Sequence, residues 1–305
     1  MRLDGIHHIT AITGDAPRNV DFYTRVMGLR MVKKSINQDH PTIYHLFYGD
    51  EHASPGLDLT FFEYPGAAPG RAGAGMVHRI AWRVGSEAAL DFWAERLGGE
   101  GVDAERGERL RFSDPEGLEH ELAVVDVPDE ALTAEHPEVP AEHALRGFHA
   151  VRAYSDDPAR SRRMLEEGLE FAPVDGAWEA RGAARGGFYA YDAPPSERGV
   201  QGAGTVHHVA WFSTDEEHEA WRDRVIATGG HPTPVIDRHY FRSIYFREPS
   251  GVLFELATPS PGFTVDEPLE TLGERLSIPP FLESRRTEIE AALKPLPYRR
   301  AAARS

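Results

Sequence analysis

The sequence repeats itself, and this repetition limits the folds that the chain can adopt more than any other feature. The segment GMVHRIAWRV from Gly75 matches GTVHHVAWFS from Gly204, and FSDPEGLEHELAVV matches FREPSGVLFELATP. Two fainter copies open with DGIHHITAIT at Asp4 and RGFHAVRAYS at Arg146. Self-similarity of this kind is the signature of a repeated structural unit, so we predict four copies of one unit.

Alignment of the four opening strands places His8, Arg79, Ala150 and His208 at one equivalent position. The spacing between them is 71 residues twice and then 58 residues, so the third unit is the shortest. Each unit begins with alternating apolar and polar residues, continues through a helical segment that ends at glycine, and closes with short strands. The pattern predicts an α+β fold of four βαβββ modules.

The order of the units divides the chain into two halves. We expect an N-terminal domain at residues 1–135, a linker at 136–145 and a C-terminal domain at 146–262, each domain containing two modules. The stretch from 126 to 145 is rich in Pro, Glu and His, which is typical of a connecting segment. Residues 263–305 form an extension, in which we expect a short helix at 283–293 and a frayed tail.

Composition excludes several classes of function. The formal net charge of −16 disfavours binding to nucleic acid, and no apolar run is long enough to span a membrane. The chain contains no cysteine, which excludes disulfides, thiolate metal sites and a cysteine nucleophile. No signal peptide is visible, and we expect a cytoplasmic protein.

Polar residues at equivalent core positions of the repeat indicate a metal site. His8 and His208 share the opening-strand position, and Glu255 lies among apolar residues in the closing strand of unit four. A buried carboxylate needs a partner or a metal, and two imidazoles with one carboxylate form the facial triad that suits Fe(II) or Mn(II). We therefore predict that units one and four together bind the metal.

Units two and three contain no such set. Their equivalent residues are Arg79, Ala150 and Glu121, of which Arg79 is cationic and Ala150 has no donor atom. We expect Glu121 to pair with Arg79 in a vestigial half. The neighbouring His7 and His207 are the alternative ligands, but strand alternation directs them to the opposite face, where they have a second-layer or a structural role.

The βαβββ repeats, the openings GIHHIT and GTVHHVAW and the closing REPSGVLFELAT resemble the vicinal oxygen chelate superfamily. Within it, the whole chain resembles the hydroquinone ring-cleaving dioxygenases. This resemblance implies two cup-shaped barrels of paired modules, with His8, His208 and Glu255 as ligands of Fe(II), or of Mn(II). It also implies further polar site residues, which by motif are His7, Thr10, His207, Arg238 and Tyr245. His239 and Tyr240 adjoin Arg238 in a loop expected to line the substrate site.

The implied reaction is extradiol cleavage of a hydroquinone by dioxygen. An acid/base must accept a hydroxyl proton, and His207, His7 and Tyr245 stay open for this role. Glu63 in LTFFEYP is an alternative fourth ligand; with it the site would resemble glyoxalase I, a metal-dependent lyase. A third hypothesis is a protein that binds an aromatic compound or a drug without turnover. We also expect a homo-oligomer, since dimers are common in this superfamily.

Overall fold

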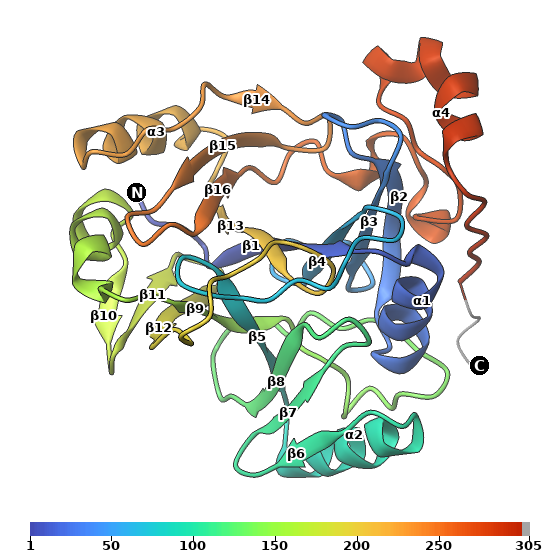
Figure 1. Ribbon diagram of the computed structural model, residues 1–305, viewed down its shortest axis with the longest axis horizontal. Helices are drawn as coiled ribbons and strands as arrows, with labels where there is room; N and C mark the ends of the chain where they lie inside the picture. Colours follow the sequence, from blue (N-terminus) through green and yellow to red (C-terminus); the bar gives the residue numbers. More distant parts are fainter. Residues whose placement is uncertain (301–305) are drawn as a thin grey trace.

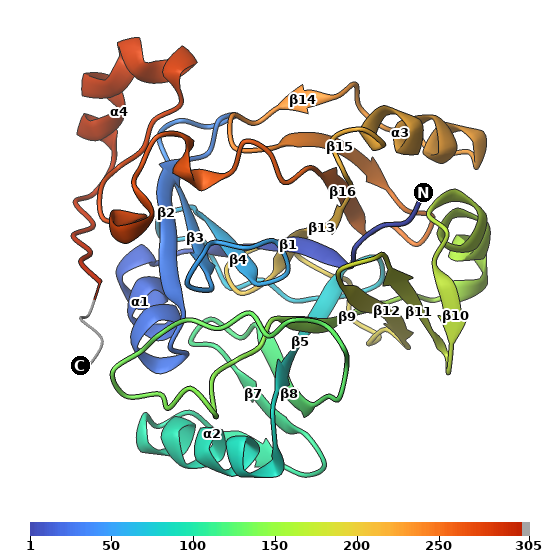
Figure 2. The same ribbon diagram turned by 180° about the vertical axis from the view of Figure 1, so that it is seen from behind.

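Four successive βαβββ modules make up residues 1–262 of the computed structural model, which describes residues 1–300 (Figures 1 and 2). The first contains β1 (Ile6–Thr13), α1 (Ala16–Val20), a π-helical turn (Asp21–Val26), β2 (Arg30–Ile36), β3 (Tyr44–Gly49) and β4 (Asp58–Glu63). The second contains β5 (Val77–Val84), α2 (Glu87–Gly99), β6 (Ala104–Arg106), β7 (Leu110–Ser113) and β8 (Glu119–Val124).

The other two modules repeat this order with shorter elements. The third contains β9 (Phe148–Tyr154), a 3₁₀ turn (Pro158–Ser161), a π-helical turn (Met164–Gly168), β10 (Ala172–Val174), β11 (Ala177–Arg181) and β12 (Gly186–Asp192). The fourth contains β13 (Val206–Phe212), α3 (His218–Ala227), β14 (Ile236–Asp237), β15 (Arg242–Arg247) and β16 (Leu253–Ala257). The predicted α+β fold of four βαβββ modules is confirmed.

The sixteen strands form two eight-stranded sheets. One sheet has the order β14-β15-β16-β13-β1-β4-β3-β2, and the other has the order β10-β11-β12-β9-β5-β8-β7-β6. The first sheet therefore joins modules one and four, and the second joins modules two and three. Each sheet combines strands from before and after the predicted linker at 136–145. The division of the chain into an N-terminal and a C-terminal domain therefore stays a prediction.

The two sheets share one register at their centres. In the first, β1 pairs antiparallel with β13, and Ile9 lies opposite Val209. In the second, β5 pairs antiparallel with β9, and Ile80 lies opposite Val151. Residues one step before Ile9, Ile80, Val151 and Val209 are therefore equivalent, which is the alignment that the sequence predicted.

Helices cover the outer face of each sheet. In α2, the Ser86 side chain accepts a hydrogen bond from the backbone N–H of Ala89, which satisfies a donor at the helix start. Leu90, Trp93 and Leu97 then repeat at helical spacing and are fully buried. Burial of these side chains on the convex face leaves the concave face of each sheet to polar residues.

The extension after residue 262 packs against the edge strand β2 (Figures 1 and 2). It contains 3₁₀ turns at Phe263–Val265, Leu269–Thr271 and Pro280–Arg285, followed by α4 (Arg286–Ala292). The predicted short helix is thus present, while residues 301–305 of the predicted tail lie outside the described residues. Among residues 1–300, no helix combines the length and the apolar character needed to cross a bilayer.

A buried lysine anchors this extension. The Lys33 side chain in β2 is fully buried, and its Nζ donates to the carbonyl of Phe263, to Asp266 at 2.6 Å and to Glu267. Asp266 also accepts a hydrogen bond from the hydroxyl of Tyr240 at 3.0 Å. Asp266 of the extension therefore links Lys33 of β2 to Tyr240 of module four.

Replacement of Lys33 by Met should lower the free energy of unfolding by about 3–5 kcal/mol, because it leaves a buried carboxylate without its partner. Urea unfolding measures this change, and Lys294→Met, at an exposed position of the same extension, is the matched control. A loss for Lys33→Met no larger than that of the control would show that the buried pair does not anchor the extension.

Candidate metal centre

The register of three neighbouring strands brings the predicted ligands together. In β1 and β13, Thr10 lies opposite His208 and His8 lies opposite Ala210. The parallel pairing of β13 with β16 then places Glu255 beside Ala210. Two histidines from modules 200 residues apart thus flank one glutamate on the concave face.

The three side chains converge on one point. Nε2 of His8 lies 3.2 Å from Oε2 of Glu255, and Nε2 of His208 lies 2.9 Å from the same oxygen. The two Nε2 atoms are 3.3 Å apart. Two donors about 2.1 Å from a shared ion and at right angles to each other lie about 3 Å apart, so the three spacings fit a facial triad.

Burial and charge also fit a cation. The Glu255 side chain is fully buried, and neither of its oxygens accepts a well-aligned hydrogen bond within residues 1–300. Burial raises the pKa of this carboxyl, but His8 and His208 outweigh it and hold the pKa well below its usual range. The site therefore presents an anionic oxygen and two imidazole nitrogens, a donor set that suits a divalent ion of the first transition row.

The preceding histidines contact the ligand histidines directly. Nδ1 of His7 lies 2.9 Å from Nδ1 of His8, and Nδ1 of His207 lies 2.8 Å from Nδ1 of His208. The strand pairing shifts register at both His7 and His207, as in a β-bulge. These shifts break the alternation, so the expected placement of His7 and His207 on the opposite face from the ligands is wrong.

The contacts of His7 define its tautomer. Burial, followed by the nearby His8, lowers its pKa to about 3, so the ring is neutral. Its Nε2 lies 3.2 Å from the carbonyl oxygen of Thr258 and must be the donor there. Nδ1 of His7 is then an acceptor for the N–H of His8, which leaves the Nε2 lone pair of His8 directed at the metal position.

A cavity of about 50 Å³ adjoins the three ligand atoms. Of the residues predicted to form the site, its lining contains the three ligands with Arg238, Tyr240 and Tyr245. Sequence reasoning missed the rest of the lining, which is aromatic or comes from the end of β2 and the loop after it: His45, Phe47, Phe62, Phe241 and residues 35–39. An aromatic wall next to two imidazoles and a carboxylate suits a flat, mostly apolar ligand with a polar edge.

Arg238 links a residue of the cavity wall to the loop at the cavity edge. Its Nε donates to the hydroxyl of Tyr245 at 3.3 Å, and its terminal nitrogens donate to Asp39 at 3.1 and 3.0 Å. The backbone carbonyl of Arg238 accepts a bond from the side chain of Gln38 at 2.7 Å. Arg238 therefore joins the loop of module one to that of module four over the ligand site.

His45 is a cavity residue that the repeat did not reveal. Burial, together with the nearby His8 and His208, lowers its pKa well below the usual range, so the ring is neutral. Its Nε2 lies 2.9 Å from the Thr60 hydroxyl, which in turn lies 2.8 Å from the Thr10 hydroxyl. Thr10 does not line the cavity but orients His45 through Thr60.

Two other expected residues lie away from the ligands. His239 is absent from the cavity lining, and its Nε2 lies 3.7 Å from Asp266 of the extension. Glu63 pairs with Thr13 at the end of β4 and accepts a hydrogen bond from the backbone N–H of Ala16. The register makes Thr60, not Glu63, the module-one counterpart of Glu255, so Glu63 as a fourth ligand is wrong.

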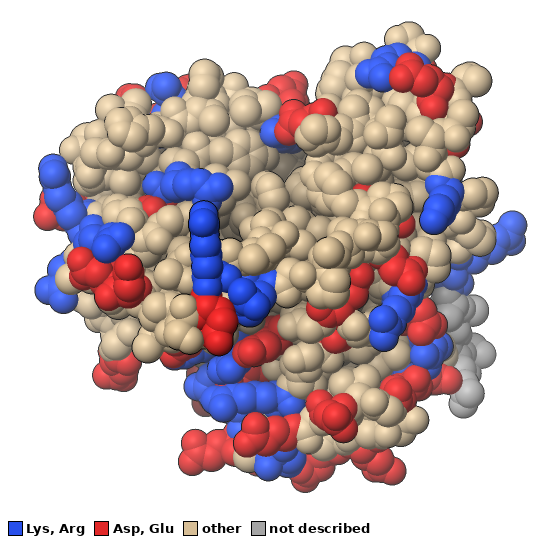
Figure 3. All heavy atoms as spheres, viewed as in Figure 1, with Lys and Arg blue, Asp and Glu red and all other residues tan. Residues whose placement is uncertain are grey.

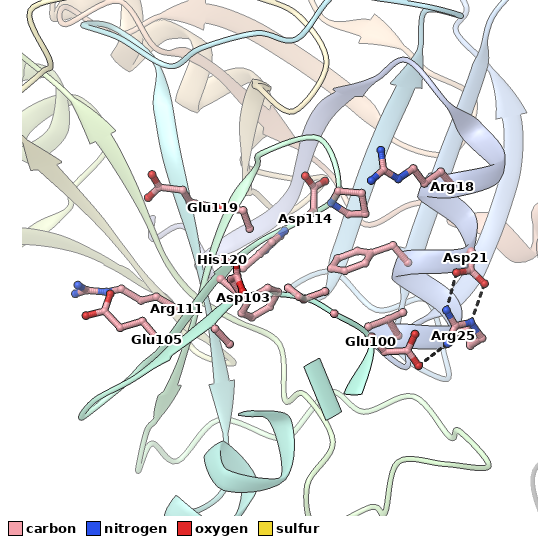
Figure 4. Close-up of a pocket in the computed structure, with 18 of the residues that line it drawn as sticks. Arg18, Asp21, Arg25, Glu100, Asp103, Glu105, Arg111, Asp114, Glu119 and His120 are labelled. Atoms are coloured by element: carbon pink, nitrogen blue, oxygen red, sulfur yellow. Dashed lines mark hydrogen bonds and ion pairs between the residues drawn. The ribbon is translucent and has the colours of Figure 1, made fainter. Parts of the chain in front are cut away.

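A hollow much larger than this cavity lies elsewhere in residues 1–300. It has a volume of about 970 Å³ and lies between the first helical segment and the strands of module two (Figure 4). Its walls are mainly charged, with Arg18, Asp21 and Arg25 on one side and Arg111 and Glu119 on the other (Figure 4). None of the three metal ligands lines it, so size alone does not indicate the site.

Comparisons with known proteins identify the family of the chain. A family model described as Glyoxalase/Bleomycin resistance protein/Dioxygenase superfamily matches residues 5–122 and 86–256. The chain belongs to this superfamily. The predicted membership is thus confirmed, and it extends over both sheets.

Members of known sequence and structure cover nearly the whole chain. A protein of Bacillus subtilis (strain 168), provisionally named ring-cleaving dioxygenase MhqA, is 41% identical over 97% of this chain and 100% of its own length. The chlorohydroquinone/hydroquinone 1,2-dioxygenase of Sphingobium indicum is 32% identical over 94% of this chain and 95% of its own. A crystal structure of a provisionally named Bacillus subtilis dioxygenase has a TM-score of 0.91 at 38% identity, covering 98% of this chain and 99% of its own.

Replacement of His8 or His208 by Ala should abolish stoichiometric binding of Fe(II), because each supplies one of only three ligand atoms. His7→Ala should retain the metal with an affinity about 10- to 100-fold lower, the usual cost of losing a group that orients a ligand. Anaerobic equilibrium dialysis followed by metal analysis measures this, with His231→Ala, at an exposed position, as control. Retention by His8→Ala together with loss by His7→Ala would show that the assignment is wrong by one residue.

Proposed function

We propose that this protein is a non-haem Fe(II)-dependent, extradiol-type dioxygenase that cleaves the ring of hydroquinones or related aromatic diols. The observation that carries the proposal is the convergence of His8, His208 and Glu255 beside an aromatic cavity. The relatives that cover nearly the whole chain are named as ring-cleaving dioxygenases, and one is named for hydroquinones. Mn(II) is the alternative metal.

The triad leaves part of a coordination sphere open. Bound there, Fe(II) would supply positions for one substrate hydroxyl and for dioxygen and would pass electron density from the ring to oxygen. The side chains of the protein would define the position of the ring: Phe47, Phe62 and Phe241 offer apolar faces, and Arg238, which Asp39 holds in place, offers a guanidinium at the edge. The ring bond beside the hydroxylated carbon breaks, and both oxygen atoms of dioxygen enter the product.

The candidates for the acid/base that transfers protons are the side chains that line the cavity. His7 and His207 contact the ligand histidines and do not line the cavity, which suits them to positioning. Tyr245 does line it, and burial, followed by the charge of Glu255, raises its pKa above the usual range. At neutral pH the Tyr245 hydroxyl therefore holds its proton and the His45 ring is neutral, which makes these two cavity groups the candidate hydrogen-bond donor and acceptor for the substrate.

A metal-dependent lyase of the glyoxalase I type is the second candidate. Maize glyoxalase I shares the fold with a TM-score of 0.59, but at 17% identity this supports the architecture alone. The fourth ligand that such a site needs is not at Glu63, and the metal-binding group found within residues 1–300 has three members. A non-catalytic binding protein would not need a buried carboxylate between two imidazoles, so the triad disfavours it.

Two further proposals concern the cellular setting. A chain without cysteine is suited to any redox compartment, and the cytoplasm stays the location that we propose. We also propose that the protein forms a homo-oligomer. Size-exclusion chromatography with light scattering measures the oligomeric state directly.

The metal-loaded protein should consume oxygen with hydroquinone or a substituted hydroquinone and form a ring-opened acid. An oxygen electrode measures the uptake after anaerobic Fe(II) loading, and mass spectrometry of the product after ¹⁸O₂ exposure should show two labelled oxygen atoms. Absence of uptake with every hydroquinone and catechol at full metal occupancy would contradict the proposal. Isomerisation of a hemithioacetal by the same preparation would instead favour the lyase.

Removal of the Tyr245 hydroxyl in Tyr245→Phe should lower kcat by about 10²–10⁴-fold, the range for loss of a proton-transfer group. Metal content should stay unchanged, because the hydroxyl bonds Arg238 and not a ligand. Steady-state oxygen uptake and metal analysis measure both quantities. An unchanged kcat would remove Tyr245 from proton transfer and direct attention to His45.

A further inference from the structure

The concave face of the second sheet contains a second polar hollow, at the place that corresponds to the metal centre of the first. It has a volume of about 390 Å³. Four of its eight lining residues are arginines, and the whole lining consists of His78, Arg79, Arg109, Arg111, Glu121, Arg152, Tyr154 and Asp192. Such a density of guanidinium groups is unexpected in a chain with a net charge of −16.

Strand register shows that the two hollows are counterparts. Ala81 pairs with Glu121 between β5 and β8, as Ala210 pairs with Glu255 between β13 and β16. Glu121 thus occupies the position of the ligand carboxylate. Two imidazoles surround that carboxylate in the first sheet, whereas three guanidiniums surround it in the second.

The surroundings of Glu121 have the opposite charge from the metal centre. Its carboxylate lies 2.5 Å from a terminal nitrogen of Arg109, 2.8 Å from Nε of Arg111 and 3.7 Å from Arg79. Burial raises the pKa of Glu121, but hydrogen bonds from Arg109 and Arg111 outweigh this and lower it. Glu121 is therefore an anion at neutral pH and balances only one of the three positive charges beside it.

Further acids pair with the other arginines of the hollow. Arg79 donates to Glu119 at 2.8 Å and 3.0 Å, and Arg152 pairs in a bidentate manner with Asp192. Four guanidiniums therefore pair with three carboxylates, and Glu105, opposite Arg111 on the neighbouring strand, adds a fourth negative charge nearby. Figure 3 shows lysine and arginine side chains gathered among acidic ones below the centre of the face, over the region of β5, β8 and β9 in Figure 1.

Glu121 is buried, whereas Arg109 and Arg111, which pair with it, are exposed to solvent. The Glu121 side chain is 1% exposed, whereas the side chains of Arg109 and Arg111 are 45% and 50% exposed. Within residues 1–300, each of these two arginines uses a single nitrogen for Glu121. Their other N–H groups donate no further hydrogen bond within that range, so half-exposed donors lie outside a carboxylate that is itself buried.

We propose that this hollow is a binding site for a compact oxyanion, a carboxylate or a phosphate. Guanidinium groups recognise such anions through paired N–H donors in a planar fork, and Arg109 and Arg111 lie on opposite oxygens of one carboxylate. Arg111 also lines the larger charged hollow, where Figure 4 shows it beside Glu105, so the site is accessible from that side. This inference is independent of the metal and of the proposed reaction.

Calorimetric titration of the metal-loaded full chain with inorganic phosphate, and separately with adipate, tests the site at constant ionic strength. We expect saturable binding of one anion per chain, and the double variant Arg109→Gln/Arg111→Gln should bind at least tenfold more weakly with unchanged metal content. Arg162→Gln/Arg163→Gln removes two exposed arginines from the third module and is the matched control. Binding of phosphate alone or of adipate alone would identify the chemistry and support the proposal.

Two results would overturn it. The first is the absence of saturable heat with both anions, beyond that of an equal ionic strength of chloride. The second is equal affinity in the Arg109→Gln/Arg111→Gln variant, which would place the anion elsewhere, including on the metal. A decrease in affinity as chloride rises is expected, because the two guanidiniums are half-exposed and therefore screened by salt.

Discussion

The antiparallel pairing of β1 with β13 is the constraint on which the site depends. It joins strands from the first and last modules, and its centre at Ile9 and Val209 places one histidine on each side of the local two-fold axis. The carboxylate of Glu255 then lies against both rings, 3.2 and 2.9 Å from their Nε2 atoms. A shift of one residue in this pairing would exchange the faces of the strand and separate the ligands.

The same constraint explains why a duplicated fold contains two different concave sites. The pairing of β5 with β9 repeats the register, but its positions hold Arg79 and Ala150 in place of the histidines. Glu121 is retained, and guanidiniums replace the imidazoles as its partners. One backbone arrangement therefore surrounds the buried carboxylate with imidazoles in one sheet and with guanidiniums in the other.

Much of the fold and the triad could be predicted, because the repeat offered an internal comparison. The four modules and the positions of His8, His208 and Glu255 followed from matching segments. His45 did not, because the corresponding position in module four holds Ser243, so no repeated histidine marked it. The alternative of Glu63 as a fourth ligand stayed open in the sequence because the register of β4 against β1, which makes Thr60 the counterpart of Glu255, is not visible there.

The positions of His7 and His207 could not be predicted from strand alternation. Alternation along a strand assigns His7 and His207 to the far face, but a bulge cancels this rule locally and returns each ring to its neighbour. His78 and His149 occupy the same position in modules two and three, beside the same shifts in pairing. A histidine at this position in all four modules was therefore the available signal.

Anomalous diffraction at the iron edge, from crystals of the Fe(II)-loaded protein, tests the central claim most directly. The account predicts one peak in the first sheet, about 2.1 Å from Nε2 of His8, Nε2 of His208 and a carboxylate oxygen of Glu255. A peak bound by His7 or His207, or one located in the second sheet beside Glu121, would contradict it.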